Sequence, residues 1–390
     1  MTKMIKMSLV AAMAVAGISS TVAAKPLSSA IENTTIGGMI RYREGFKNID
    51  NGASTEQQQA KMVVGLKSKV NDKVTASVKF VGVLNQKDSV TKGAPGLDVA
   101  KFTYANGKGC TLTAGLMELA TPWTDAADGA RANGLLATKA VNGITFAAAI
   151  LRDSTMGADK TVGIDANDIT AVAAIGKAGS VSYQAWYATI GNGDAGLNAA
   201  GKPKANALPS GGDAVALVAS AKVGPAAVNA SYASLEGDNN TLKKQTLIKA
   251  VASAKAGSAT VVAGFAKGGS DGDLVTFDQD AKVGFESWNI RAGGAGQYDL
   301  SAYTVAAVAP VNGIALKAQY TGASFDNGTA ATAGDTDVTE LLLQASYKMS
   351  KNFGGYLRYA SVDQDAKATS TSATVNTKFN RTRLEIKYTF

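Results

Sequence analysis

Apolar and polar side chains alternate one residue at a time in segments that recur along this chain. The clearest segment closes the sequence, where one side of an extended chain carries four apolar residues: Leu384, Ile386, Tyr388 and Phe390. The same period marks residues 36–43, 74–80 and 314–321. Because successive side chains of a β-strand point to opposite faces, this period predicts an all-β protein whose strands have one apolar and one polar face.

Strands of this kind build either a soluble sandwich, with the apolar faces in a core, or a membrane barrel, with the apolar faces in lipid. Short turn signals such as Asn106-Gly107 and Asn312-Gly313 alternate with long polar segments such as 191–212 and 326–337. Outer-membrane barrels have this asymmetry, with short periplasmic turns and long outer loops. Many of the apolar residues are also small, which suits a lipid-facing band better than a packed core. We therefore predict a transmembrane antiparallel β-barrel.

The length of the chain sets the size of this barrel. At about 20 residues for each strand and its share of loop, residues 25–390 give about 18 strands, within a range of about 16–18. Barrels of about 16–18 strands keep an aqueous lumen, which favours a channel. We expect the first strand, near 36–44, to pair with the last, near 379–390, and so to close the sheet.

Residues 1–24 have the order of a secretory signal peptide. Lys3 and Lys6 precede an apolar stretch over 7–18, and small residues follow as far as Ala24. We expect cleavage after Ala24, which divides the chain into a signal peptide (1–24) and a barrel domain (25–390). The formal net charge is +8, but an exported protein with charges dispersed over solvated faces is not expected to bind nucleic acid.

Histidine is absent from the chain, and Cys110 is its single cysteine. Without histidine there is no Ser-His or Cys-His catalysis and no histidine-ligated metal. One cysteine forms no internal disulfide. Phospholipases and proteases built on outer-membrane barrels rely on histidine, so we do not expect an enzyme.

Three further segments carry a family pattern. The stretch that begins Lys25-Pro26-Leu27 leads into Arg41-Tyr42-Arg43 in the first predicted strand. Trp123-Thr124-Asp125 precedes the predicted strand 141–148, and the last strand ends on an aromatic residue. These segments resemble the Campylobacter major outer membrane protein family, closely at both ends and in the first third of the chain. From about residue 155 to 340 the likeness is mainly in the regular spacing of the predicted strands along the sequence.

The resemblance implies an 18-stranded general porin of a Gram-negative outer membrane, surrounded by lipid and assembled as a homotrimer. The aromatic C-terminus is of the kind that the barrel assembly machinery of outer membranes recognises. In that family, calcium can sit at the narrowest point of the channel, and the acidic positions that match are Asp128, Asp159 and Asp278, with Asp125 as a competitor for Asp128. Ca²⁺ takes about six to eight oxygen ligands, so carbonyls and waters would complete such a site.

Residues 116–136 are longer than a turn, and we predict that they fold inward as a constriction loop. This segment carries Asp125, Asp128 and Arg131. Basic residues predicted to face it from the barrel wall are Arg41, Arg43, Lys79, Lys317, Arg358, Arg383 and Lys387. Acidic groups facing basic ones across a narrow gap would order polar solutes and set ion preference. Alternatively, 116–136 packs outside the lumen, and the basic residues only keep the wall hydrated.

A second acidic segment contains Asp271-Gly272-Asp273 and Asp278-Gln279-Asp280. Its spacing is loosely similar to a calcium loop, but it lacks the consecutive pattern of an EF-hand. We therefore expect a solvated loop here.

The function predicted from these features is a passive, water-filled diffusion channel for ions and small hydrophilic solutes. A substrate-specific outer-membrane channel is the first alternative. A porin that is also an adhesin through its extracellular loops is the second. The resemblance points to a mild preference for cations, whereas the residues themselves leave the sign of the preference open.

Overall fold

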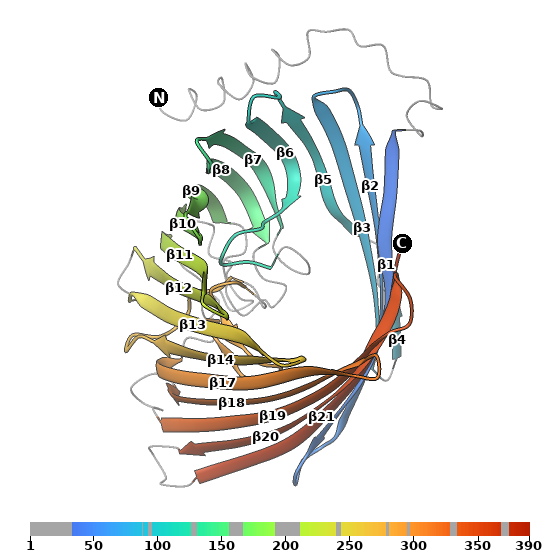
Figure 1. Ribbon diagram of the computed structural model, residues 1–390, viewed down its shortest axis with the longest axis vertical. Coiled ribbons are helices and arrows are strands. Elements are labelled where there is room, and N and C mark those ends of the chain that lie inside the picture. Colours follow the sequence, from blue (N-terminus) through green and yellow to red (C-terminus); the bar gives the residue numbers. More distant parts are fainter. Residues whose placement is uncertain are drawn as a thin grey trace, which may run out of the picture.

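The computed structural model describes residues 33–87, 89–92, 96–125, 131–155, 167–191, 211–238, 243–277, 281–294, 297–327, 334–367 and 374–390. Eighteen antiparallel strands form one closed barrel (Figure 1). No helix in this described part of the chain is long and apolar enough to cross a membrane. The proposed signal peptide, residues 1–24, lies outside the described residues.

The barrel strands follow one another around the wall in chain order. They are β1 (Thr34–Ile49), β2 (Thr55–Lys69), β3 (Val74–Lys87), β5 (Gly96–Ala105), β6 (Cys110–Glu118), β7 (Arg131–Val141), β8 (Ile144–Thr155), β9 (Asn167–Ala178), β10 (Val181–Ile190), β11 (Gly212–Val223), β12 (Ala226–Gly237), β13 (Gln245–Ala256), β14 (Ala259–Gly268), β17 (Tyr298–Val311), β18 (Ile314–Asn327), β19 (Gly334–Lys348), β20 (Phe353–Lys367) and β21 (Thr374–Thr389). Three short strands add to them: β4 (Ser89–Lys92) extends the β3 hairpin, while β15 (Phe285–Glu286) and β16 (Arg291–Ala292) pair with each other.

The first and last strands close the barrel. β1 pairs with β2 on one side and with β21 on the other, where Met39 lies opposite Thr389 and Ile49 opposite Phe379. Every barrel strand therefore has two hydrogen-bonded neighbours, and no barrel edge is left open. The predicted pairing of the two chain ends is confirmed, as is the predicted strand number.

The two-residue period of the sequence separates an outer from an inner face. On β18, Leu316 and Tyr320 are exposed on the outside, whereas Gln319 and Thr321 are buried on the inside. The inner residues bond to one another and to β17: the Gln319 amide donates to Thr304 Oγ1 over 3.1 Å, and the Thr304 and Thr321 hydroxyls lie 3.0 Å apart. This arrangement, with apolar side chains outside and hydrogen-bonded polar ones inside, is the reverse of that in a soluble protein, whose apolar side chains form the core.

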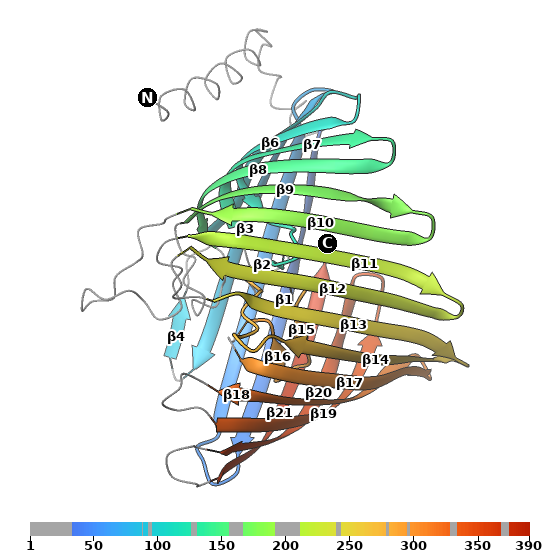
Figure 2. The same ribbon diagram turned by 90° about the vertical axis from the view of Figure 1, so that its left-hand side faces the viewer.

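Short turns join the strands at one end of the barrel, and longer connections lie at the other (Figure 2). In two of the short turns, Asn142-Gly143 and Asn312-Gly313, both residues have positive φ: 49° and 81° in the first, 48° and 80° in the second. This is the type I′ geometry that asparagine and glycine accept most readily and that matches the twist of a hairpin. The turn signals in the sequence are thus confirmed.

The inside of the barrel is filled unevenly. A buried apolar cluster runs along the inner faces of β6 to β20 and includes residues of two segments that leave the wall, between 119 and 123 and between 274 and 292. Met117, Trp123, Phe277 and Leu247 are among its fully buried members. The inner faces of β1, β20 and β21 instead carry arginine and lysine. The charged side of the interior is therefore the side on which the barrel closes.

We predict that Gly38→Ala weakens this closure. Gly38 exchanges two backbone hydrogen bonds with Phe390, of 3.0 and 3.1 Å. An added Cβ would lie 2.8 Å from the Phe390 ring and closer still to the Val63 carbonyl oxygen, so the β1–β2–β21 seam would have to shift. Overpacking of this kind costs about 1–3 kcal/mol. The heat-modifiable mobility of the folded barrel in detergent should be lost at a lower temperature.

Gly65→Ala on β2 is the matched control, because the nearest atom to its added Cβ lies at an ordinary 3.6 Å. Equal melting temperatures for the two variants would contradict the role assigned to Gly38.

Candidate functional site

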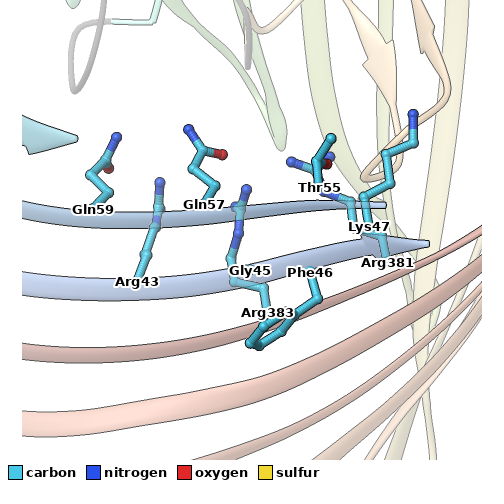
Figure 3. A pocket seen from close by; sticks show the side chains of 9 residues that line it. All are labelled: Arg43, Gly45, Phe46, Lys47, Thr55, Gln57, Gln59, Arg381 and Arg383. Atoms are coloured by element: carbon cyan, nitrogen blue, oxygen red, sulfur yellow. The ribbon is translucent and has the colours of Figure 1, made fainter. Parts of the chain in front are cut away.

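A row of basic side chains lines the inner face at the seam. We call Arg43 and Lys47 of β1, Arg358 of β20, and Arg381 and Arg383 of β21 the basic wall. Strand register brings them together, because Lys47 lies opposite Arg381, and Arg383 lies opposite Arg358. Figure 3 shows Arg43 and Lys47 pointing to one side of the sheet and Phe46, between them in sequence, to the other. The alternation of β1 thus directs the charges inward.

The contacts of the basic wall are mostly neutral. Arg43 is an exception, since its Nε lies 2.5 Å from Glu385 Oε2, and the Glu340 carboxylate acts on Arg381. Arg358 Nε donates to the Gln344 amide oxygen over 2.7 Å. Lys47 Nζ lies 4.0 Å from the centre of the Phe379 ring. The wall therefore holds more positive than negative charge.

A long connection between β14 and β17, residues 269–297, enters the barrel, and we call it the inner loop. It carries β15 and β16, which Figure 2 shows within the barrel outline. Its residue Trp288 is buried against the basic wall, with the Trp288 ring centre 4.5 Å from Arg381 Cζ, 5.0 Å from Arg383 Cζ and 5.2 Å from Arg358 Cζ. Guanidinium groups are attracted to the indole face at such distances. The inner loop thereby covers part of the arginine cluster.

A buried carboxylate on β19 fixes the tip of the inner loop. Glu340 is only 1% exposed, and its two oxygens accept the backbone N–H groups of Trp288, over 3.0 Å, and Asn289, over 2.6 Å. Arg381 Nη1 donates to the Asn289 side-chain oxygen over 3.1 Å. A carboxylate that accepts two N–H groups in a buried setting is a strong, directional anchor. Glu340 therefore determines where Trp288 meets the arginines.

The other side of the inner loop is held by β13 and by the loop itself. Lys249 Nζ donates to the carbonyl oxygens of Lys282 and Gly284, the latter over 2.6 Å. Asp273 is fully buried and accepts the N–H groups of Gly293 over 2.6 Å and Gln297 over 2.8 Å. The expectation of a solvated loop is therefore wrong for Asp273, because its carboxylate satisfies backbone donors that the barrel interior hides from water.

The predicted constriction loop, 116–136, is shorter in the structure, because 116–118 end β6 and 131–136 begin β7. Its described part between these strands, 119–125, joins the same interior. The Trp123 ring lies 5.9 Å from that of Phe277 in the inner loop and 6.1 Å from that of Trp186 on β10. The Phe277 N–H donates to the Trp123 carbonyl oxygen over 2.9 Å. Asp125 is half-buried, and Asp128 lies outside the described residues. That these two carboxylates form the constriction stays a prediction.

Arg131, the third residue proposed for that loop, belongs to an ion network among β3, β5, β6 and β7. It is buried and donates to both oxygens of Asp98, over 3.0 and 2.8 Å. Lys79 Nζ lies 2.6 Å from the same Asp98 and also contacts Glu118. Two cations and two carboxylates balance here, so this network differs from the basic wall.

Of the other residues proposed for the wall, Arg41 and Lys317 lie on the inner faces of their strands, and Lys387 shares the face of Glu385 on β21 but is exposed. Arg41 is buried, and its Nη2 donates to the Gln59 side-chain oxygen over 3.0 Å. Lys317 on β18 lies opposite Gln344. The proposed calcium ligands Asp128, Asp159 and Asp278 all lie outside the described residues, and the described ones contain no group of three acidic, cysteine or histidine side chains that could hold a metal. Calcium binding stays a prediction.

Sequence reasoning missed the groups that organise this site. Glu340, Glu385 and Asp98 each anchor a basic group or a loop, and Trp288 joins three arginines. The two-residue period places Glu340 and Glu385 on the inner faces of their strands and so could have marked them. Nothing local to Trp288 indicates its partners, because they lie on strands far along the chain.

A family model described as Campylobacter major outer membrane protein matches residues 2–388 of the chain. No curated protein sequence matches it. Among solved structures, a BenF-like porin from Pseudomonas fluorescens Pf-5 is similar, with TM-score 0.70 and 15% identity over 92% of this chain and 99% of that one. Pseudomonas aeruginosa OccK2 (OpdF) gives TM-score 0.69 at 14% identity, covering 92% and 98%. Acinetobacter baumannii OccAB2 gives 0.67 at 14%, covering 93% and 99%. At these identities the structures establish a shared fold.

We predict that Glu340→Gln releases the tip of the inner loop. An amide keeps one acceptor oxygen and replaces the other by a donor, so one of the two N–H groups from Trp288 and Asn289 loses its partner. A buried donor left unpaired costs about 1–3 kcal/mol. The folded barrel should then be cut faster within the inner loop by limited proteolysis, and open channels should show more current noise.

Asp337→Asn is the matched control, an exposed carboxylate on the same strand. If the two variants resist protease equally, Glu340 is not the anchor of the loop.

Proposed function

Because the chain belongs to the Campylobacter major outer membrane protein family, a family of outer-membrane proteins, we propose that it is a general diffusion porin. In this proposal it forms a passive, water-filled channel for ions and small hydrophilic solutes. The single observation that carries the proposal is the closed 18-stranded barrel with an apolar outer belt and a charged inner wall. Barrels of about this size leave an aqueous channel when side chains and loops do not fill them.

The proposed channel selects solutes by their size and charge and does not catalyse a reaction. The chain has no histidine, and the buried carboxylates of the described residues are all engaged, Glu340 and Asp273 by backbone N–H groups and Glu385 by Arg43 and Tyr356. Such groups position a loop or a side chain and are not available as general bases. We therefore propose a channel without enzymatic activity.

A substrate-specific channel is the second candidate, and one observation favours it. The basic wall lies on one side of the interior, whereas an apolar cluster follows the inner faces from β6 to β20. Solutes that pass the charged side meet several arginines and one lysine in succession. A solute that these groups bind would pass more readily than a neutral one of equal size.

The quaternary structure and the metal are part of the same proposal. The family resemblance supports a homotrimer in outer-membrane lipid, inserted by the barrel assembly machinery. It also supports a calcium ion at Asp128, Asp159 and Asp278, the positions that match the family. An adhesin role for the loops is compatible with the channel but has no observation of its own.

We predict stepwise, ohmic conductance when the purified chain is added to planar lipid bilayers. Liposomes that contain it should swell in sugar solutions at rates that fall smoothly with the size of the sugar, because a wide aqueous pore selects by diameter. Swelling with only one class of solute would favour the specific channel. Bilayers that stay silent with folded, heat-modifiable protein would refute a channel altogether.

We also predict that replacing Asp125 and Asp128 together by Asn shifts the reversal potential in a KCl gradient toward anions. Carboxylates at a narrow, partly dewetted point act on ions more strongly than the same charges in bulk water. The calcium dependence of conductance should weaken in the same variant. Asp72→Asn in an exposed short turn is the control. An unchanged reversal potential in the double variant would remove 116–136 from the constriction and leave the porin proposal standing.

A further inference from the structure

A hollow lies in the middle of the inner face of β1, between Arg43 and Lys47 (Figure 3). The residue between them on this face is Gly45, which has no side chain. A Cβ added there would meet only two backbone oxygens, Thr382 O at 3.5 Å and Gln57 O at 3.9 Å. The hollow is thus open above the backbone.

Strand register surrounds Gly45 with a three-by-three grid of inward side chains. Across β1, Thr55 of β2 and Arg381 of β21 lie opposite Lys47, whereas Gln57 and Arg383 lie opposite Gly45 itself. In the third row, Gln59 and Glu385 lie opposite Arg43. Neighbouring strands lie about 4.8 Å apart and alternate residues about 6.7 Å apart, so these neighbours surround one small space, which all of them except Glu385 line.

The grid carries a surplus of positive charge. Its four cations are Arg43, Lys47, Arg381 and Arg383, and its single carboxylate is Glu385. That carboxylate already accepts Arg43 Nε, over 2.5 Å, and the Tyr356 hydroxyl, over 3.2 Å. Among described residues, Lys47 lies over the Phe379 ring, and Arg383 contacts the Trp288 ring and the Tyr356 hydroxyl. Arg381 contacts the Trp288 ring and the Asn289 side chain, and the one carboxylate that acts on it, Glu340, already accepts two backbone N–H groups.

The arginines keep donors free for a ligand. The Trp288 ring attracts both guanidinium groups, and beyond it Arg381 donates to Asn289 and Arg383 hydrogen-bonds to Tyr356, out of five N–H donors on each arginine. Guanidinium N–H groups lie in the plane of the guanidinium and point outward from its edge, in the fork that fits two oxygens of one anion. Gln57 and Thr55 add neutral donors from the opposite side of the hollow.

We propose that the hollow above Gly45 binds one oxyanion group, a carboxylate or a phosphate, of a solute in transit. This deepens the proposed channel function and rests on it, since the hollow lies on the inner wall. A single small group fits, because Gly45 is the one position of the grid that lacks a side chain. Oxyanions would thus have a binding site on one side of the interior, whatever preference the narrowest point of the channel shows.

The test adds inorganic phosphate or succinate to protein reconstituted in planar bilayers in KCl. Both are expected to reduce the KCl current at millimolar concentration. Gly45→Val fills the hollow without changing charge, and Arg383→Gln removes one guanidinium from its rim. Each should weaken the inhibition about tenfold or more, as for the loss of a charge-assisted hydrogen bond. Inhibition by one of the two anions alone supports the site and identifies the group it binds.

Lys67→Gln is the charge-matched control, because Lys67 shares the inner face of β2 with Gln57 but lies outside the grid. The anions should inhibit this variant as strongly as they inhibit the wild type. If neither anion affects the current, or if Gly45→Val, Arg383→Gln and Lys67→Gln behave alike, the inference fails although ohmic channels persist. Calorimetric titration of detergent-solubilised, heat-modifiable protein with inorganic phosphate gives the same comparison without conductance. It therefore tests the site even if the channel proposal fails.

Discussion

The structure depends on the satisfaction of backbone hydrogen bonds where no water can supply them. In a membrane, each unpaired N–H or C=O group costs several kcal/mol, so a sheet must have no edge. The pairing of β1 with β21 meets this requirement by joining the ends of the described chain. Once the sheet is closed, each strand has one lipid face and one inner face, and the alternation of side chains follows. Closure thus gives the alternating side chains an inside to face, and every arginine in the basic wall lies on that inner side.

The features that could be predicted from the sequence are those that repeat. The two-residue period predicted the strands, the Asn-Gly pairs predicted the hairpins, and the inward position of Arg43 and Arg383 followed from the same alternation. The inner loop could not be found in this way. Its position comes from Glu340, Lys249 and the arginines around Trp288, which are distant in sequence and leave no local period. The acidic segment that contains Asp273 was therefore mistaken for a solvated loop.

The uneven interior gives the two halves of the barrel different tasks. Residues 119–123 and much of the inner loop are packed with apolar inner-face residues of β6 to β20, so this part of the interior behaves as a core. The half around β1 and β21 keeps charged groups whose partners are aromatic rings, amides and one carboxylate. Rigid packing on one side can hold Trp288 against the arginines on the other. The apolar cluster thus supports the position of the charged side chains.

The same seam has a consequence for the time course of folding. Arg43 and Glu385, which face each other across β1 and β21, are separated by 342 residues in the chain. Contacts between such distant segments carry a large loop-closure entropy and form late, so proteins rich in them fold slowly. Until the seam forms, the growing sheet exposes two strand edges that could pair with other chains. The ion pair that completes the basic wall is therefore also among the last contacts that the nascent barrel can make.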